Sequence, residues 1–375
     1  MKIVVAGFIV RYPLGGNAWH QLQYVLGLER LGHDVAFVEH AAWDESCFDP
    51  VDDVMTSDPT RGLAFLRDVW ERHGVRASCC YVDERGGEHN MTRQELEVKC
   101  GEADLLINIG NVNWLPEFEL CRRRALVDID PVFTQIGAVG MIDPHEHHDI
   151  LFTFGENMVG AGEAVPFDAA HWLPTRQPIV LDCWPARPGD PSAAMTSVIN
   201  WTAYGDHVFE GQTFGQKDRQ FEPFFDLPRT VDRPMELALG APLDVQDRLR
   251  CGGWAVVDPM AVSRNTATFQ AYLAASSAEF CVAKHGYVIS RSGWFSDRSA
   301  CYLAAGRPVI LEDTGFSAVL ACGDGLLPFS SPGDARAAIK AVDSNYDHHC
   351  RAAREVAEEY FDSDVILTAL LERAT

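Results

Sequence analysis

The chain has 375 residues, of which 47% are hydrophobic and 23% are charged. These are globular values, and the length suggests two domains. Lysine and arginine total 31 against 54 aspartate and glutamate residues, which gives a formal net charge of −23. This balance argues against a general nucleic-acid or membrane-surface binder, so we expect no nucleic-acid partner. No apolar run approaches the roughly 20 residues that span a bilayer, so we also expect no membrane insertion.

The cysteines point to a reducing compartment. There are 11 of them, an odd number, with no C-x-x-C spacing. Such a set fits buried, reduced thiols and does not fit a zinc site or a disulfide framework. The first residues enter a strand pattern directly, without the layout of a signal peptide. We therefore expect a cytoplasmic protein that is a monomer or a homodimer.

The first part of the chain alternates strand and helix patterns. A Gly15-Gly16 loop separates the first strand pattern from the first helix pattern. Strand patterns occur at residues 2–8, 34–40, 76–82, 104–109, 124–129 and 150–154, and helix patterns at 18–31, 61–73 and 92–99. Apolar, β-branched strands between helices are typical of a mostly parallel sheet with helices on both faces.

A proline-rich stretch, residues 172–192, separates this block from a second one and contains a short strand pattern at 179–184. Strand patterns follow at residues 196–201, 235–239, 254–257, 278–282 and 308–311. Helix patterns lie at 263–275 with Ser263 as N-cap, at 296–305, from Pro332 with Ser331 as N-cap, and at 347–360 and 364–373. The two blocks predict an α/β protein with two doubly wound, Rossmann-like domains.

Residues 291–316, RSGWFSDRSACYLAAGRPVILEDTGF, are the most informative stretch. They predict a loop, a helix that begins at Ser296 or Asp297 and stops at Gly306, a buried strand, and a second loop with Thr314-Gly315. Helix N-termini offer free N–H groups and a positive dipole end to phosphates. Two such positions close together suit a diphosphate. An ordinary α/β unit, with Gly306 as helix C-cap, is the alternative.

This stretch resembles the nucleotide-sugar half of GT-B glycosyltransferases, where a Gly/Ser loop, a helix ending in A-x-G-x-P-V-I and an acidic-Thr-Gly loop hold the donor. Residues 15–35, ending R-L-G-H-D-V, resemble the first βαβ turn of the same enzymes. The resemblance implies two facing Rossmann-like domains: an acceptor-side domain at 1–175, a linker at 176–192, a donor domain at 193–360, and a terminal helix at 361–375 that packs back on the first domain. The chain departs from the retaining families because Gly293 and Cys301 stand at their E-x7-E positions.

The resemblance also implies a donor site, in which Glu312 or Asp313 would bind the sugar hydroxyls. Fixed N–H groups and cations would stabilise the leaving diphosphate without a metal or cofactor. For each basic residue a solvated surface role is the alternative. The candidate donor-site residues are Gly16, Asn200, Lys217, Lys284, Arg291, Ser292, Gly293, Arg298, Asp313, Thr314 and Gly315.

Two residues are candidate catalytic bases. His20 lies in the first turn of the first helix, where inverting GT-B enzymes place a base, and a carboxylate beside it would orient the imidazole. Asp130 follows a strand at the edge where open α/β sheets bind ligands. A surface or capping role is the alternative for His20, and a turn role before Pro131 is the alternative for Asp130. The five residues 145–149, HEHHD, have a metal-like composition, but consecutive residues cannot all face one ion, so we assign no metal.

The resulting hypothesis is a metal-independent glycosyltransferase that moves a sugar from a nucleotide sugar to a small-molecule acceptor, as in natural-product biosynthesis. A nucleotide-sugar 2-epimerase of the same fold and a non-catalytic sugar-nucleotide-binding protein are the alternatives. A dinucleotide-dependent dehydrogenase is disfavoured because the first loop lacks G-x-G-x-x-G. The sequence leaves the sugar, the nucleobase and the stereochemistry open.

Overall fold

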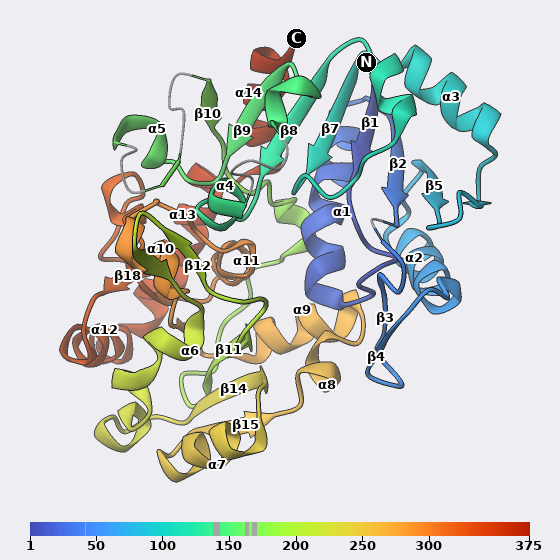
Figure 1. Ribbon diagram of the computed structural model, residues 1–375. Coiled ribbons are helices and arrows are strands. Elements are labelled where there is room, and N and C mark those ends of the chain that lie inside the picture. Colours follow the sequence, from blue (N-terminus) through green and yellow to red (C-terminus); the bar gives the residue numbers. More distant parts are fainter. Residues whose placement is uncertain (42, 138–142, 162–164, 167–170) are drawn as a thin grey trace.

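A computed structural model describes residues 1–41, 43–137, 143–161, 165–166 and 171–375. The chain builds one mostly parallel and one fully parallel sheet, each covered by helices (Figure 1). We call the part around the eight-stranded sheet the N-terminal half and the part around the six-stranded sheet the C-terminal half. The predicted α/β architecture with two Rossmann-like units is therefore confirmed.

The sheet of the N-terminal half has the strand order β10-β9-β8-β7-β1-β2-β5-β6. All neighbouring strands pair in parallel except β5 and β6, which are antiparallel. The central strands are buried on both faces, as their continuous apolar runs require. The strands are β1 (Lys2–Ala6), β2 (Asp34–His40), β5 (Ser78–Val82), β6 (Glu88–His89), β7 (Leu105–Ile109), β8 (Arg124–Asp128), β9 (Ile150–Thr153) and β10 (Trp172–Pro174).

Helix α1 (Gly15–Arg30) is buried along almost its whole length, because the sheet, α9 of the C-terminal half and α14 all contact it. A hairpin of β3 (Cys47–Asp49) and β4 (Val54–Thr56) projects from this half beyond β2 (Figure 1). The remaining helices of the half are α2 (Thr60–His73), α3 (Arg93–Glu102), α4 (Phe133–Gly137) and α5 (Met158–Ala161). In the part of the chain that the structure describes, no helix combines the length and the apolarity of a bilayer span.

The sheet of the C-terminal half has the order β15-β14-β11-β16-β17-β18, and all its pairs are parallel. Its strands are β11 (Met195–Asn200), β14 (Met235–Gly240), β15 (Ala255–Val257), β16 (Ala278–Cys281), β17 (Val309–Glu312) and β18 (Leu326–Phe329). A small hairpin, β12 (His207–Phe209) and β13 (Gln212–Phe214), follows β11. The helices are α6 (Lys217–Gln220), α7 (Leu243–Cys251), α8 (Pro259–Ser263), α9 (Thr266–Ala275), α10 (His285–Ser290), α11 (Asp297–Ala304), α12 (Pro332–Ser344) and α13 (Tyr346–Tyr360).

The final helix, α14 (Ser363–Ala374), contacts α1 of the N-terminal half (Figure 1). Gly27 of α1 makes this contact possible, since a Cβ atom there would lie 2.5 Å from Leu367 Cδ1. The segment of the chain that connects β10 to β11 contains a 3₁₀ turn at Leu181–Cys183 and a single bridge from Ile179 to Asp362. The division of the chain into domains at 175 and 192 stays a prediction.

Several predicted elements are corrected by the structure. The segment 179–184, expected to be a strand, contains a 3₁₀ turn instead. Ile179 forms only an isolated β-bridge with Asp362 and does not pair with a strand of either sheet. Gly15 and Gly16 do not form a loop but begin α1, where they let the helix approach α9 closely. Asn265, not Ser263, caps α9, and its side chain accepts from the Thr268 N–H. The cap at Ser331 is confirmed.

Candidate active site between the two halves

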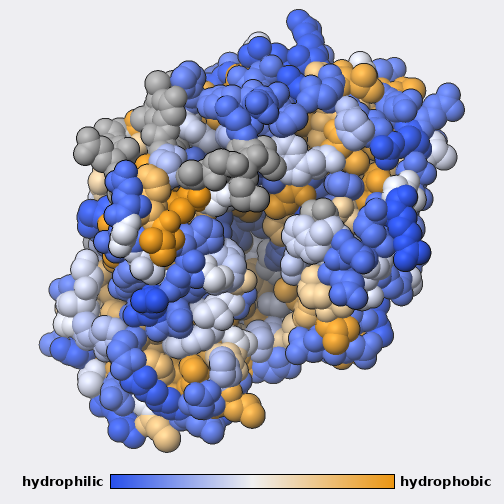
Figure 2. Space-filling model, in the orientation of Figure 1, coloured by the Kyte–Doolittle hydropathy of each residue, from blue (hydrophilic) through white to orange (hydrophobic). Residues whose placement is uncertain are grey.

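The strand order of the C-terminal sheet reverses between β11 and β16. Open α/β sheets bind ligands at the carboxyl ends of the strands on either side of such a reversal. The carboxyl end of β8 and the first turns of α1 contribute from the N-terminal half, through Asp130 and His20. Figure 2 shows a hollow in this face, which lies between α1 and α11 in the orientation of Figure 1.

A cavity of about 1000 Å³ opens at the ends of β11, β14 and β15. Its size is that of pockets that hold large small-molecule ligands. The C-terminal half lines it with Asn200, Gly240, Val257 and Asp258 among others, and the N-terminal half adds Leu14, Phe48, Pro50 and Asp53. Of the predicted site residues, only Asn200 lines this cavity. Sequence reasoning did not predict the other lining residues, because no sequence motif marks the ends of β14 and β15.

His20 meets a carboxylate from the opposite half. Its Nδ1 lies 3.5 Å from Oδ2 of Asp297, the first residue of α11. Its Nε2 is buried and has no hydrogen-bond partner among the described residues. Burial raises the pKa of Asp297, the contacts with His20 lower it, and the net shift is downward. Asp297 therefore stays ionised and can orient the imidazole, which leaves Nε2 as the nitrogen free to accept a proton.

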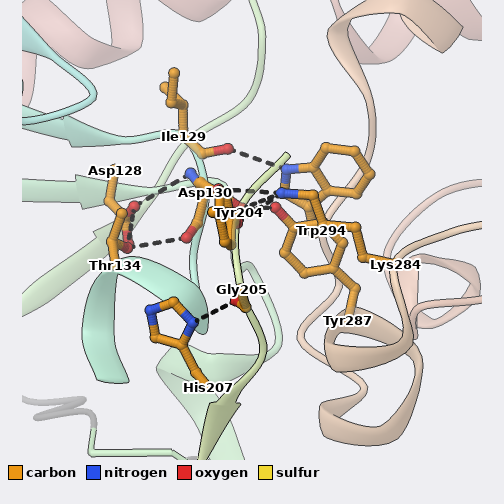
Figure 3. Close-up of polar contacts among 10 residues, drawn as sticks. All are labelled: Asp128, Ile129, Asp130, Thr134, Tyr204, Gly205, His207, Lys284, Tyr287 and Trp294. Atoms are coloured by element: carbon orange, nitrogen blue, oxygen red, sulfur yellow. Dashed lines mark hydrogen bonds and ion pairs between the residues drawn. The ribbon is translucent and has the colours of Figure 1, made fainter. Parts of the chain in front are cut away.

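Asp130 meets several donors of the C-terminal half (Figure 3). Lys284 Nζ lies 3.1 Å from its Oδ2 and 3.2 Å from its Oδ1. The hydroxyl groups of Tyr204 and Tyr287 also donate to this carboxylate. Burial lowers the pKa of Lys284, and Asp130 opposes that shift. Of the two candidate bases, Asp130 is thus already saturated with donors, whereas His20 keeps a free nitrogen.

Asp128 lies at the end of the same strand, but its carboxylate is bonded within the N-terminal half. It is buried, and its carboxylate accepts from Thr134 Oγ1 at 2.6 Å and from Gln135 Nε2 at 2.9 Å. Burial raises its pKa to about 6 despite these bonds. Asp128 therefore holds α4 against the sheet, while Asp130 reaches across to the C-terminal half.

Two other predicted basic residues are tied to the C-terminal half itself. Lys217 is buried, and its ammonium donates to the carbonyl of Val282. Arg298 Nε donates to the fully buried Glu279 at 2.6 Å, and its Nη1 donates to the carbonyl of Val198 at 2.8 Å. The guanidinium of Arg298 therefore links β11 to β16 and has few free donors for a phosphate.

The two glycine loops predicted to hold phosphates are filled by the chain. The Gly293 N–H donates to the Thr314 carbonyl at 2.9 Å, and the Gly315 N–H donates to Asp313 at 2.8 Å. Asn157 of the N-terminal half enters between them, and its Nδ2 donates to the Gly315 carbonyl at 2.8 Å. The Thr314 hydroxyl donates to the Trp294 carbonyl at 2.5 Å. In this state, the two glycine N–H groups are bonded within the C-terminal half and do not face an open site, while Asn157 joins the halves through the loop carbonyl groups.

The remaining predicted donor residues lie around these loops. Gly16 faces the ring of Phe269, which a Cβ atom would approach to 2.9 Å. Ser292 is fully buried and accepts from the Asn157 N–H through its carbonyl. Arg291 is exposed and lies 3.6 Å from Asp313. The roles of these residues in donor binding stay predictions.

Glu312, expected to contact sugar hydroxyls, is buried at the end of β17. Its carboxyl group accepts from Gln220 at 2.5 Å and from the Ala283 N–H at 3.1 Å. Burial raises its pKa to about 7. The group is therefore a buried link between β17 and the end of β16 in this state.

The HEHHD stretch lies away from the hollow. His148 is buried, and its Nε2 lies 3.1 Å from Asn108 Nδ2 while its Nδ1 lies 3.0 Å from the carbonyl of Pro144. Within the described ranges, no three His, Cys, Asp or Glu side chains are placed to hold a metal ion.

Of the predicted residues, the structure thus pairs Asp130 with Lys284 and places His20 against Asp297, both across the junction of the halves, while Asn200 lines the cavity. Sequence reasoning missed Asp297 as the partner of His20, although its place at a helix start was predicted. It also missed the tyrosines at 204 and 287, which no motif marks.

No family model and no curated protein sequence matches this chain. Solved structures do. An alpha-glucosyltransferase in complex with UDP-glucose and DNA containing an abasic site has 11% identity and a TM-score of 0.61, over 99% of this chain and 98% of that chain. Anabaena Alr3699/HepE in complex with UDP and glucose has 12% identity and a TM-score of 0.56, over 100% and 99%. AviGT4, a glycosyltransferase involved in avilamycin A biosynthesis, has 12% identity and a TM-score of 0.54, over 100% and 97%.

At these identities the similarity shows the fold, and that fold is GT-B, as the resemblance implied. The expectation of no nucleic-acid partner, which rested on the net charge, is wrong, because an alpha-glucosyltransferase of this fold binds DNA in the matched structures. Net charge is a property of the whole surface, whereas acceptor binding uses the local surface of the cleft. The value of −23 therefore cannot decide the acceptor class.

Proposed function

We propose that this chain is a glycosyltransferase that moves a sugar from a nucleoside-diphosphate sugar to a hydroxyl group of a small-molecule acceptor. The observation that carries the proposal is the pair of His20 and Asp297, 3.5 Å apart across the junction of the halves. A histidine whose second nitrogen is unpartnered and whose first nitrogen faces a carboxylate is arranged as a general base. The position of the pair at the junction of the halves supports this role.

The cavity at the ends of β11, β14 and β15 would hold the nucleoside of the donor. Its position beside the strand reversal, at the carboxyl end of β11, and its volume of about 1000 Å³ support this assignment. The diphosphate would then extend toward β16, where the ammonium group of Lys284 lies. Cations fixed in a cleft stabilise the growing charge of a leaving diphosphate.

In the chemical step, His20 Nε2 takes the proton of the acceptor hydroxyl. The acceptor oxygen forms a bond to the anomeric carbon of the sugar, and the bond from that carbon to the diphosphate oxygen breaks. The diphosphate leaves with the electron pair, and Asp297 stabilises the imidazolium that has formed. Because Nε2 is buried in this state, we expect a small separation of the halves to admit the acceptor.

The acceptor would enter on the N-terminal side of this same cavity, where Leu14, Phe48 and Pro50 offer apolar surface, while the nucleoside lies on the opposite side, against the ends of β14 and β15. Such surface suits a small molecule with an apolar body. AviGT4, a matched structure described as acting in avilamycin A biosynthesis, supports this acceptor class.

The test has two stages. Thermal unfolding is first measured with UDP, GDP, ADP, TDP and CDP, where a ligand at 100 times its Kd adds roughly 2.7 kcal/mol. The matching nucleotide sugar is then incubated with a panel of hydroxylated aromatic compounds, oligosaccharides, and duplex DNA with and without an HMU base. Nucleotide release and the mass of the product are measured.

A product formed on a small hydroxylated compound, dependent on His20, would support the proposal. Transfer to DNA alone would replace the acceptor class and keep the transferase. Nucleotide binding without transfer to any acceptor would favour a binding protein, and no response to any nucleotide would refute the donor site.

A further inference from the structure

Three donor groups of the C-terminal half converge on the carboxylate of Asp130 (Figure 3). The ammonium of Lys284 lies 3.1 Å from Oδ2, and the phenol hydroxyls of Tyr204 and Tyr287 each donate to one of the two oxygens. Lys284 also donates to the Tyr204 hydroxyl at 2.7 Å, so the donors form one connected set. Charge-assisted bonds of this kind are the strongest that an oxyanion receives from side chains.

Ring packing holds these donors in place independently of Asp130. Lys284 Nζ lies 4.8 Å from the ring centroid of Phe133, 4.5 Å from that of Tyr204 and 5.3 Å from that of Tyr287. The ring of Tyr287 also stacks on Trp294 with centroids 4.2 Å apart. Such cation–π and stacking contacts fix the ammonium and both hydroxyls toward one point.

The acceptor of these bonds comes from the other half. Asp130 follows β8, and its side chain is 26% exposed, so it lies at the boundary with solvent. Its backbone is bonded to Asp128 and Thr134 of its own half, whereas the hydrogen bonds of its carboxylate, among the described residues, all come from the C-terminal half. A carboxylate in this position resembles a bound anion more than a structural core residue.

We propose that Lys284, Tyr204 and Tyr287 form an oxyanion-binding site for the diphosphate of the donor, which Asp130 fills while the donor is absent. The inference rests on the proposed function, because it assigns the ligand of this site from the donor. A diphosphate carries more charge and more oxygens than one carboxylate, so it can replace Asp130 on the same donors. Donor affinity is then reduced by the free energy needed to displace Asp130.

The decisive variant is Asp130→Asn. The amide keeps the shape of the side chain and one oxygen acceptor, but it removes the charge that competes with a phosphate. Calorimetric titration with inorganic pyrophosphate and with UDP should show at least about tenfold tighter binding to the variant than to the natural protein. Glu102→Gln is the matched control, since it also removes one carboxylate and one ion pair, with Lys2, on an exposed surface. The control should leave both affinities unchanged.

A second substitution tests the donors themselves. Tyr287→Phe keeps the ring that stacks on Trp294 and removes only the hydroxyl, and in the Asp130→Asn background it should lower pyrophosphate affinity several-fold. Equal affinity of natural protein and Asp130→Asn for both anions would overturn the inference, provided that both proteins melt as folded chains.

The two proposals fail differently. Tighter pyrophosphate binding to Asp130→Asn with no binding of any nucleoside diphosphate would support the anion site and refute its assignment to a nucleotide donor. UDP binding with the same affinity in both proteins would support the donor site and refute the role of Asp130.

Discussion

Among the described residues, two pairs of a carboxylate and a basic side chain connect the halves, and they differ in how many hydrogen bonds their polar atoms make. His20 and Asp297 approach only to 3.5 Å, and Nε2 of the histidine has no partner among the described residues. Asp130 and Lys284 approach to 3.1 Å, with two tyrosine hydroxyls on the same carboxylate. A pair with a free nitrogen can take up a proton from a substrate. The Asp130 carboxylate has no comparable free atom, so we expect it to keep these contacts until a competing anion takes its place.

The comparison shows why residue type alone does not identify a catalytic group. Histidine and aspartate are both suitable bases, and both stand at ends of elements that face the junction. What separates them is the number of donors already directed at each one. The following variants test that separation, from the largest expected effect to the smallest.

His20→Asn should lower the rate of sugar transfer by roughly 10²- to 10⁴-fold, because general-base assistance is lost while the shape of the helix turn is kept. Steady-state kinetics with the nucleotide sugar found in the binding screen provide the measurement. Asp297→Asn should cause a smaller loss, and nucleotide affinity should stay unchanged in both variants. Transfer within threefold of the natural rate would assign the free nitrogen no role.

Arg298→Met extends the comparison to a saturated pair inside one half. It should lower the free energy of unfolding by about 3–5 kcal/mol, because Glu279 is fully buried and would lose its cation. Urea unfolding followed by tryptophan fluorescence measures the loss. The double variant with Glu279→Gln should recover much of it. Weaker nucleotide binding at unchanged stability would instead make Arg298 a phosphate ligand.

Glu312 is a buried carboxyl group whose pKa is raised to about 7 by burial, without a close cation bond. Between about pH 4.5 and 7 the folded chain keeps a proton that the unfolded chain has released, so stability falls as pH rises through this window. Glu312→Gln removes this contribution. The difference in unfolding free energy, variant minus natural protein, should therefore rise by up to about 3 kcal/mol from pH 4.5 to 7.5. A constant difference across this range would show that the carboxyl group titrates normally.

Gly315→Ala probes a junction contact that involves no charge. Gly315 has φ +100°, and a Cβ atom would lie 2.5 Å from Asn157 Nδ2 and 2.7 Å from the Arg291 carbonyl oxygen. We expect a loss of about 1–3 kcal/mol in unfolding free energy. Gly323→Ala is the matched control, since its φ is +115° but no heavy atom lies within 4 Å. Equal losses would show that the contact with Asn157 adds nothing beyond backbone strain.

The sequence predicts the fold well because most core strands are short, mainly apolar segments that alternate with helix patterns. It fails where an element depends on contacts distant in the chain. Ile179 looks like a strand residue, but its neighbour is Asp362 and not another strand. Gly15 and Gly16 look like a loop, but their lack of side chains serves the contact with α9.

Sequence reasoning identifies single candidate residues of the site but not the residues that they contact. It identifies His20 by its position in the first turn of the first helix, and Lys284 as a basic residue that follows the strand pattern at 278–282. Their partners, Asp297 and Asp130, come from the opposite half, and only the folded chain decides which carboxylate meets which base. The loops at Gly293 and Gly315 have the composition of phosphate sites, but Asn157 and the loops themselves use their polar groups.

The contact of α14 with α1 has a consequence for the order in which the molecule is completed during synthesis. The strands and helices of the first half leave the ribosome before the second sheet is made, and α14 follows only after that sheet. Until then the surface of α1 around Gly27, which Leu367 later covers, stays exposed to solvent. The nascent chain therefore leaves this face of α1 uncovered through the translation of the entire second half.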